Sequence, residues 1–313
     1  MINSFFSLFI FPGLLFVIAG GLVFEYVDRK VHARMQNRQG PPWFQPVADM
    51  IKLLTKESIV PENADRQIFR LAPVVALTAA VTSFLYIPLW QSQAVYSFKG
   101  DLIVVFYLLT LPTMALFLAG WSATSLYSLI GAVRSMTQLF AYEVPFFMGI
   151  LAPCILADTW SLSGVADYYQ KMPAMTLVNA IGFMVALIAL LGKLEKVPFD
   201  IPEAETEIVA GPLTEYSGWA LALFRLTLDV ELFVGASLMA AVFLPFGFGL
   251  PGWAAFIVYI LRLLVVVGLI TLLRTLFARL RLEQMVNFCW KYLAPAALLQ
   301  LLINLFCKAY LSQ

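Results

Sequence analysis

The sequence has few charged side chains. Only 12% of its 313 residues are Asp, Glu, Lys or Arg, whereas soluble domains average about 25%. Hydrophobic residues make up 61% of the chain, and the mean hydropathy is +0.86. This composition excludes an ordinary soluble domain and is typical of an integral membrane protein. The net charge of +1 also argues against a nucleic-acid partner, because proteins that bind nucleic acids have a strong basic bias.

Metal-binding residues are scarce as well. The chain has one histidine, His32, and three cysteines, Cys154, Cys289 and Cys307, with no Cys-x-x-Cys pair among them. A zinc site of His and Cys ligands, or an iron–sulfur cluster held by four cysteines, needs more ligands than these. We therefore expect that this chain binds no metal or cofactor alone, and that any such group sits on a partner protein.

Long apolar segments occupy most of the chain. A helix crosses the hydrocarbon core of a bilayer in about 20 apolar residues. Because backbone polar groups must be paired inside lipid, each such segment is predicted to be a helix. The sequence thus predicts an all-α, polytopic membrane protein, a single domain over residues 1–313. Its eight predicted transmembrane helices lie near residues 5–27, 69–90, 102–127, 139–157, 174–192, 217–244, 253–277 and 293–311.

The distribution of Lys and Arg predicts how the chain is oriented. With eight spans, both termini lie on one side of the membrane. The loops after the first, third, fifth and seventh spans, with their flanks, hold fifteen Lys and Arg residues, and the other side holds three, Lys99, Lys171 and Lys308. Cytoplasmic loops carry the excess of positive charge. We therefore predict that both termini face outward.

The first cytoplasmic loop, residues 28–68, is predicted to contain a helix of its own. Gly40-Pro-Pro42 separates this helix from the first span. In the stretch that follows, apolar residues recur at helical spacing, at Val47, Met50, Ile51 and Leu54. Charged residues fall on the other side of this helix, at Asp49, Lys52 and Lys56. The pattern is typical of an amphipathic helix that lies at the membrane surface.

A second cytoplasmic loop, residues 193–216, is strongly acidic. It holds six carboxylates, Glu195, Asp200, Glu203, Glu205, Glu207 and Glu215. One interpretation is a solvated acidic surface. The apolar, proline-containing stretches Pro198-Phe-Asp-Ile-Pro202 and Ile208-Val-Ala-Gly-Pro212 argue against full solvation. Because charge is costly near lipid, the loop is a candidate for part of a proton path or for the seat of a redox partner.

Five further charges fall inside the predicted spans. They are Glu143, Arg225, Asp229, Glu231 and Arg262. Arg225 and Asp229 are four residues apart, so they can pair on one helix face. Paired charges that only fix the register of the helices are one interpretation. Glu143 and Glu231 have no obvious local partner, which favours a role in a hydrated proton path.

Long motifs in the chain resemble subunit 1 of respiratory complex I. The similarity is carried by Asp28-Arg-Lys30, Gly40-Pro-Pro-Trp-Phe-Gln-Pro46 with the helix after it, Pro198-Phe-Asp-Ile-Pro-Glu-Ala-Glu-Thr-Glu207, Glu215-Tyr-Ser-Gly218 and Ala278-Arg-Leu-Arg-Leu-Glu283. The family includes the matching subunit of energy-converting, membrane-bound nickel–iron hydrogenases, formate hydrogenlyase among them. The resemblance covers nearly the whole chain.

The resemblance implies a docking and coupling subunit without a redox centre. Expected partners are a hydrogenase-like large subunit and a small iron–sulfur subunit, which carry the nickel–iron site and the clusters, and antiporter-like and small membrane subunits. The implied docking surface comprises Arg29, Lys30, Arg38, Asp49, Lys52 and Asp200. Glu203, Glu205, Glu207 and Glu215 join Glu143, Asp229 and Glu231 as candidates for a proton relay, and Arg225 and Arg262 as buried pairing charges.

Two departures bear on the branch of the family. The stretch Gly40-Pro-Pro-Trp-Phe-Gln-Pro46 is shorter than in complex I, and Gly211-Pro-Leu-Thr-Glu215 is similar to the hydrogenase form. Arg134-Ser-Met-Thr-Gln138 and Trp290-Lys-Tyr-Leu293 resemble complex I equally. The two departures favour the hydrogenase branch, in a bacterial or archaeal cytoplasmic membrane. A quinone-binding subunit of a complex I type enzyme and a stand-alone secondary transporter are the alternatives.

Overall fold

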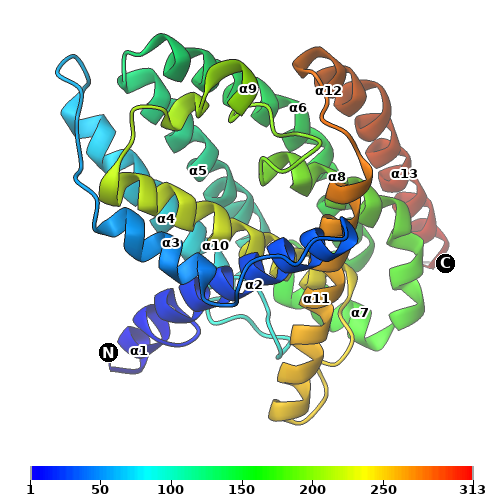
Figure 1. Ribbon diagram of the computed structural model, residues 1–313. Coiled ribbons are helices and arrows are strands. Elements are labelled where there is room, and N and C mark those ends of the chain that lie inside the picture. Colours follow the sequence, from blue (N-terminus) through cyan, green and yellow to red (C-terminus); the bar gives the residue numbers. More distant parts are fainter. Residues whose placement is uncertain (1, 312–313) are drawn as a thin grey trace.

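The fold was analysed in a computed structural model, which describes residues 2–311 (Figure 1). Every regular element in that range is helical, as the sequence predicts. The helices are α1 Ile2–Phe9, α2 Leu14–Met35, α3 Gln45–Leu54, α4 Arg66–Phe84, α5 Asp101–Ser122, α6 Leu126–Ala157, α7 Leu162–Lys171, α8 Ala180–Lys193, α9 Glu205–Ile208, α10 Gly218–Phe243, α11 Gly252–Leu276, α12 Leu282–Phe288 and α13 Ala294–Leu311. Short 3-10 turns cover Pro173–Asn179 and Gly211–Leu213, and a π-helical turn, Cys289–Leu293, joins α12 to α13.

Eight helical segments in the described range are long and apolar enough to cross a membrane. The predicted number of spans is thus confirmed, and the chain is a multi-pass membrane protein. The spans are Phe6–Met35, Arg66–Phe84, Asp101–Ser122, Leu126–Ala157, Pro173–Lys193, Gly218–Phe243, Gly252–Leu276 and Leu282–Tyr310.

Several predicted ends of these spans are wrong. The fourth span begins at Leu126 rather than near residue 139, because Arg134 does not end the helix: its guanidinium reaches Glu207 at 2.6 Å. The second span ends at Phe84 rather than near residue 90, ahead of Pro88, since a residue before proline disfavours the helical conformation. The first and last spans are longer than predicted. Helix α2 continues beyond the first apolar segment to Met35, and α12 adds residues from Leu282 before the last one.

Helix α10 forms the centre of the bundle and packs against α2, α4 and α11. In the most apolar 18-residue stretch of α10, 94% of the residues are buried inside the protein. Small residues allow this close packing: a Cβ atom on Gly235 would lie 2.6 Å from a methyl carbon of Leu190, and one on Gly21 of α2 would lie 3.0 Å from the carbonyl oxygen of Asp229. Helix–helix contacts in membranes depend on such small residues.

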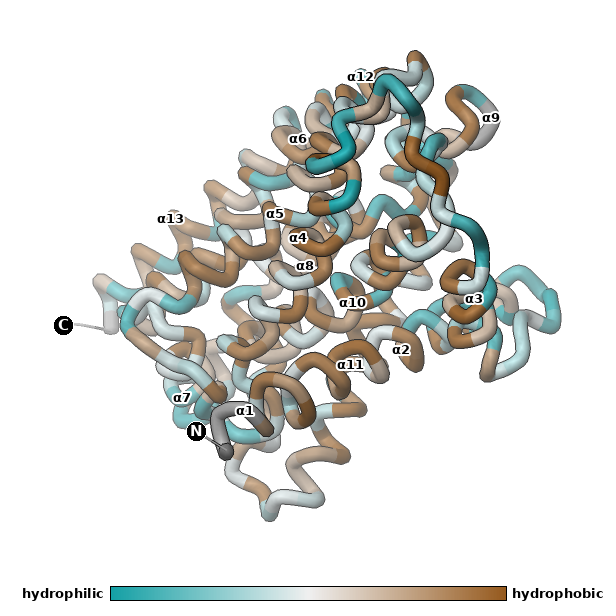
Figure 2. The backbone as a smooth tube through the Cα atoms, turned by 90° about the vertical axis from the view of Figure 1, so that its left-hand side faces the viewer, coloured by the Kyte–Doolittle hydropathy of each residue, from teal (hydrophilic) through white to brown (hydrophobic). Residues whose placement is uncertain are grey.

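The two ends of the bundle differ in polarity (Figure 2). Both termini and α7 lie at one end, whereas α3, α9 and the start of α12 lie at the other, where hydrophilic segments gather. The amphipathic helix is confirmed as α3. Val47, Ile51 and Leu54 on it are exposed apolar residues, while Asp49 and Lys52 face a cavity.

Arg262 lies in α11 with 2% of its surface exposed. The expectation that it pairs with a buried charge is wrong: its guanidinium donates to two backbone carbonyls, Leu244 at 3.0 Å and Leu89 at 2.7 Å. It also lies 4.4 Å from the ring centre of Phe248. Leu244 directly follows α10, where the helix end leaves carbonyl acceptors without helical donors, and Leu89 lies in the loop after α4. Arg262 therefore ties three spans together at one end of the bundle.

We predict that Arg262→Met destabilises the protein by about 3 kcal/mol, because two hydrogen bonds to a charged donor contribute about 1.5–3 kcal/mol each. Chemical denaturation in mild detergent measures the change. Lys308→Met is the control, since the ion pair of Lys308 with Asp158 is exposed and such pairs contribute roughly 0–1 kcal/mol. Equal effects of the two substitutions would contradict this account of Arg262.

Candidate functional site

A cavity of about 680 Å³ opens at the polar end of the bundle. Helices α2, α3, α10 and α11 and the loop after α8 form its walls. Thirteen of its nineteen lining residues are charged, whereas small-molecule sites are mostly apolar with a few polar groups. The charged residues are Glu25, Arg29, Asp49, Lys52, Lys56, Glu195, Lys196, Asp200, Glu203, Arg225, Asp229, Arg274 and Arg279.

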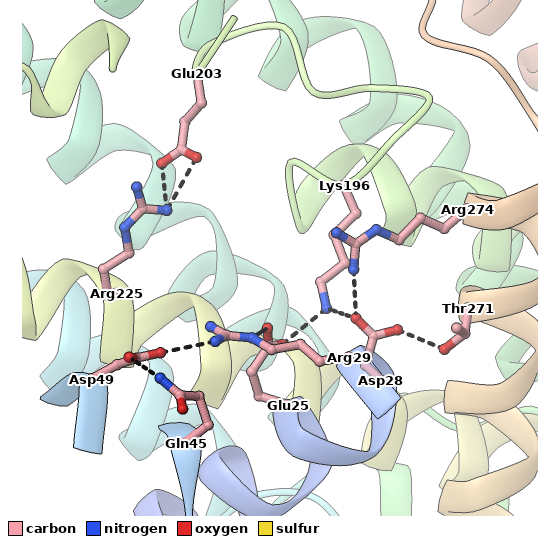
Figure 3. A network of polar contacts seen from close by, with 10 residues as sticks. All are labelled: Glu25, Asp28, Arg29, Gln45, Asp49, Lys196, Glu203, Arg225, Thr271 and Arg274. Atoms are coloured by element: carbon pink, nitrogen blue, oxygen red, sulfur yellow. Dashed lines mark hydrogen bonds and ion pairs between the residues drawn. The ribbon is translucent and has the colours of Figure 1, made fainter. Parts of the chain in front are cut away.

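Asp28 anchors the network of ion pairs along this cavity (Figure 3). Its carboxylate has no exposed surface and accepts from Lys196 at 2.5 Å, from Arg274 at 2.8 Å and from the hydroxyl of Thr271 at 2.6 Å. Burial acts to lower the pKa of Lys196, but the charges of Asp28 and Glu25 outweigh it and raise that pKa above its ordinary value. Lys196 is therefore held as a cation between α2 and α11.

Arg29 connects the same helix to α3. It pairs with Glu25 at 2.7 Å and with Asp49 at 3.0 Å, and Gln45 donates to the other oxygen of Asp49 at 2.8 Å (Figure 3). The predicted docking residues Arg29 and Asp49 thus form one contact between the first span and the amphipathic helix. Lys52 and Asp200 line the same cavity.

Arg225 corrects another expectation. Instead of pairing with Asp229 one turn along α10, it reaches Glu203 in the acidic loop at 2.9 Å (Figure 3). Its side chain is 43% exposed, so it is not a buried charge. Glu203, Arg225 and Asp229 all line the cavity, and the carboxylate of the loop approaches the guanidinium there.

Glu195 lies at the inner end of the cavity. Its backbone has a φ of 51°, a left-handed conformation that is uncommon outside glycine. One of its carboxyl oxygens, Oε2, is buried and has no hydrogen-bond partner in the described part of the chain. Burial raises the pKa of the Glu195 carboxyl well above its usual range, and the nearby charges of Glu203 and Glu231 raise it further.

A second, smaller cavity continues from Glu195 into the bundle. It has about 20 Å³ of space and is lined by Glu195, Lys193, Glu231, Thr113 and Thr227 among others. Lys193 at the end of α8 and Glu231 on α10 form an ion pair of 2.7 Å, with 2% of each side chain exposed. Sequence reasoning found no partner for Glu231; the structure provides one from another helix.

The remaining predicted site residues lie away from the large cavity. Glu143 is half-buried on α6, and Glu215 is half-buried near the end of the acidic loop. Glu207 pairs with Arg134 at 2.6 Å on the surface, which lowers the pKa of its carboxyl. Three others were predicted at or near the docking surface: Lys30 donates to the carbonyl of Pro41, Arg38 is exposed, and the side chain of Glu205 lies outside the described residues.

Sequence reasoning missed Glu25, Asp28, Lys193, Glu195 and Lys196 as site residues. Glu25 and Asp28 are three residues apart, which places both on one helix face, and this spacing was a usable signal. For Glu195 the signal was weaker: a carboxylate between Leu194 and Val197 just before Pro198. Among the residues described, no group of three or more His, Cys, Asp or Glu residues has a geometry that could hold a metal ion.

Comparison with known proteins identifies the family. The profile of the NADH dehydrogenase family matches residues 8–305. The chain is 36% identical to the H-type subunit of NADH-quinone oxidoreductase from Carboxydothermus hydrogenoformans, over 94% of this chain and 86% of that protein. It is 35% identical to the protein of the same name from Anoxybacillus flavithermus, over 96% and 92% of the two chains.

A solved structure has the same fold. It comes from the membrane-bound sulfane sulfur reductase, described as an archaeal respiratory membrane complex. The TM-score is 0.81 with 26% sequence identity, and the match covers 93% of this chain and 97% of that chain. Family profile, relatives and fold agree with the eight apolar spans. The chain belongs to the NADH dehydrogenase subunit 1 family and is a membrane subunit of a respiratory complex.

Proposed function

We propose that this chain docks the soluble redox arm of a complex I-like ion pump to its membrane arm and relays protons through buried carboxylates. The observation that carries the proposal is the charged cavity that ends at Glu195. It connects the polar end of the protein with carboxylates inside the bundle, which is what a proton path requires. Orientation follows from the fifteen Lys and Arg residues that flank this end: it faces the cytoplasm, and the termini face outward.

The redox arm in this proposal is of the nickel–iron hydrogenase type. Its nickel–iron site and iron–sulfur clusters would be held by a large and a small partner subunit, with antiporter-like and small membrane subunits beside this chain. The charged lining of the cavity supports this choice, because a hydrophobic quinone tail needs an apolar tunnel. The second candidate is a quinone-binding subunit, favoured by the names of the relatives in Carboxydothermus and Anoxybacillus.

The metal content of the intact complex tests the choice of branch. We expect about one nickel per complex when the assembly is purified through this subunit in mild detergent, because a single hydrogenase site holds nickel on thiolate ligands of the partner. Elemental analysis provides the number, with iron and sulfide measured in the same sample. Iron and sulfide without nickel would reject the hydrogenase arm and favour the quinone-binding candidate or a sulfur-reducing arm.

Glu195→Gln tests the relay. A glutamine keeps the shape of the side chain but cannot carry a proton, so we expect the complex to assemble and proton uptake in proteoliposomes to fall about tenfold or more, within the range that proton-transferring groups contribute. Glu62→Gln, an exposed carboxylate in the loop before α4, is the control and should pump normally. Normal pumping by the Glu195 variant would show that protons do not pass this carboxyl.

Arg38→Ala tests the docking surface. Arg38 is exposed at the polar end of the bundle, so loss of its charge should weaken attachment of the soluble arm and lower recovery of the whole complex severalfold at moderate salt. Lys99→Ala, an exposed charge elsewhere in the chain, should leave recovery unchanged. Full recovery of the complex from the Arg38 variant over a range of salt concentrations would count against docking through this residue.

A further inference from the structure

The ion pair between Lys193 and Glu231 lies at the junction of several spans. Lys193 ends α8 and Glu231 lies in the middle of α10, and only 2% of each side chain is exposed. The ammonium group also donates to the backbone carbonyl of Leu109 in α5. Pro112, three residues further along α5, has no amide hydrogen and removes a helical hydrogen bond next to that carbonyl. The lysine is thus held between a carboxylate and a carbonyl at an interrupted turn.

On one side of this pair lies the route from the large cavity. Glu195 lines both the 680 Å³ cavity and the 20 Å³ cavity that contains the pair. The smaller space has room for about one water molecule, and its other polar walls are the hydroxyl groups of Thr113 and Thr227. Glu195 and Glu231 therefore lie on the walls of one water-sized space.

On the other side of the pair lies Glu143 of α6. Helices α6 and α8 are in close contact here: a Cβ atom on Gly192 would lie 3.1 Å from the Cβ atom of Tyr142, and Gln138 donates to the Gly192 carbonyl at 2.7 Å. Lys193 and Glu143 are the next residues in the two helices, and the charge of Lys193 acts on Glu143. Among the side chains that the structure describes, none forms a hydrogen bond or ion pair with the carboxyl group of Glu143.

We propose that Lys193 is the gate of the relay, moving its ammonium group between Glu231 and Glu143. This inference rests on the proposed function. In the arrangement seen, the ammonium keeps Glu231 as a carboxylate. A proton that leaves Glu195 through the water forms an O–H bond on Glu231, which becomes neutral and no longer attracts the ammonium. The flexible stem of the lysine then carries its charge to Glu143, which releases its proton to the adjoining part of the complex and pairs with the ammonium as a carboxylate, while Glu195 takes a new proton from the cavity. Glu231 next passes its proton to Glu143 and becomes a carboxylate again, and the ammonium returns to it.

This arrangement prevents two steps from occurring together. While the ammonium lies on Glu231, Glu143 has no ion-pair partner among the described residues, and a proton on it is retained. When the ammonium lies on Glu143, that carboxyl is ionised and its proton has been displaced into the adjoining part of the complex. A fixed pair that only sets the register of α8 against α10 would need neither the cavity beside it nor an unpaired carboxyl one helix away.

The test compares Lys193→Met with Lys193→Arg in the whole complex reconstituted into proteoliposomes. Methionine keeps the apolar stem without the charge, so we expect proton pumping to fall at least tenfold while electron transfer with artificial redox partners stays within about twofold of the wild type. Arginine keeps a cation and should restore part of the pumping. Normal pumping by Lys193→Met would overturn the gate.

An infrared measurement separates a gate from a structural pair. Removing the ammonium leaves Glu231 buried without its partner, so Lys193→Met should show a new carboxylic-acid C=O band that disappears in Lys193→Met/Glu231→Gln. The double variant has no unpaired buried charge, so it also shows whether poor assembly, rather than lost gating, lowers pumping in the single variant. If the double variant pumps normally, the pair is structural and the gate is wrong.

Failure of the gate can be told apart from failure of the relay. Glu143→Gln and Glu231→Gln remove the two carboxylates and leave the lysine in place. If these variants do not pump and Lys193→Met does, the relay stands and the gate is rejected. If both glutamine variants and Glu195→Gln pump normally, the relay itself is rejected.

Discussion

The carboxylate of Asp28 holds the polar end of this protein in place. It has no exposed surface, and it takes hydrogen bonds from Lys196, Arg274 and Thr271, which belong to the loop after α8 and to α11. Isolated charges are too costly to bury away from water, so these groups are stable only together. Because Lys196 is fixed, the residue before it, Glu195, is fixed at the inner end of the cavity. The cavity, the acidic loop and the small water-sized space beyond it all depend on this one cluster.

Composition was sufficient to predict the number and approximate places of the spans, because the membrane imposes a length and an apolar composition on each of them, but it did not predict all of their ends. The amphipathic helix α3 was also predictable from spacing. The pairs within the site were not, since Asp28 meets residues 168 and 246 positions away in the sequence. Local spacing suggested Arg225 with Asp229, and the structure replaced that pair with Arg225 and Glu203, because tertiary contacts override the neighbour one turn away. For Glu195 the sequence shows an acidic residue just before Pro198, but neither its left-handed backbone nor its burial.

The polarity of the site bears on what passes through it. A cavity walled by both cations and carboxylates binds water and small ions well, and it solvates an isoprenoid tail poorly. The lining alternates in sign along its walls, with Arg29 beside Asp49 and Arg225 beside Glu203, so each fixed charge is largely compensated. One carboxyl oxygen of Glu195, Oε2, is buried and has no hydrogen-bond partner among the residues that the structure describes.

Two cations are buried in this protein, Arg262 at one end of the bundle and Lys193 inside it, and different kinds of acceptor compensate their charges. Arg262 satisfies its charge with carbonyl groups of Leu89 and Leu244, acceptors that cannot be protonated near neutral pH, so its position is permanent. Lys193 satisfies its charge with Glu231, an acceptor that loses its attraction once it gains a proton. Arginine retains its own proton at all physiological pH values, whereas lysine has a flexible stem and a compact charge. In the proposed relay, Arg262 therefore holds three spans in place, and Lys193 provides the cation that an arriving proton displaces.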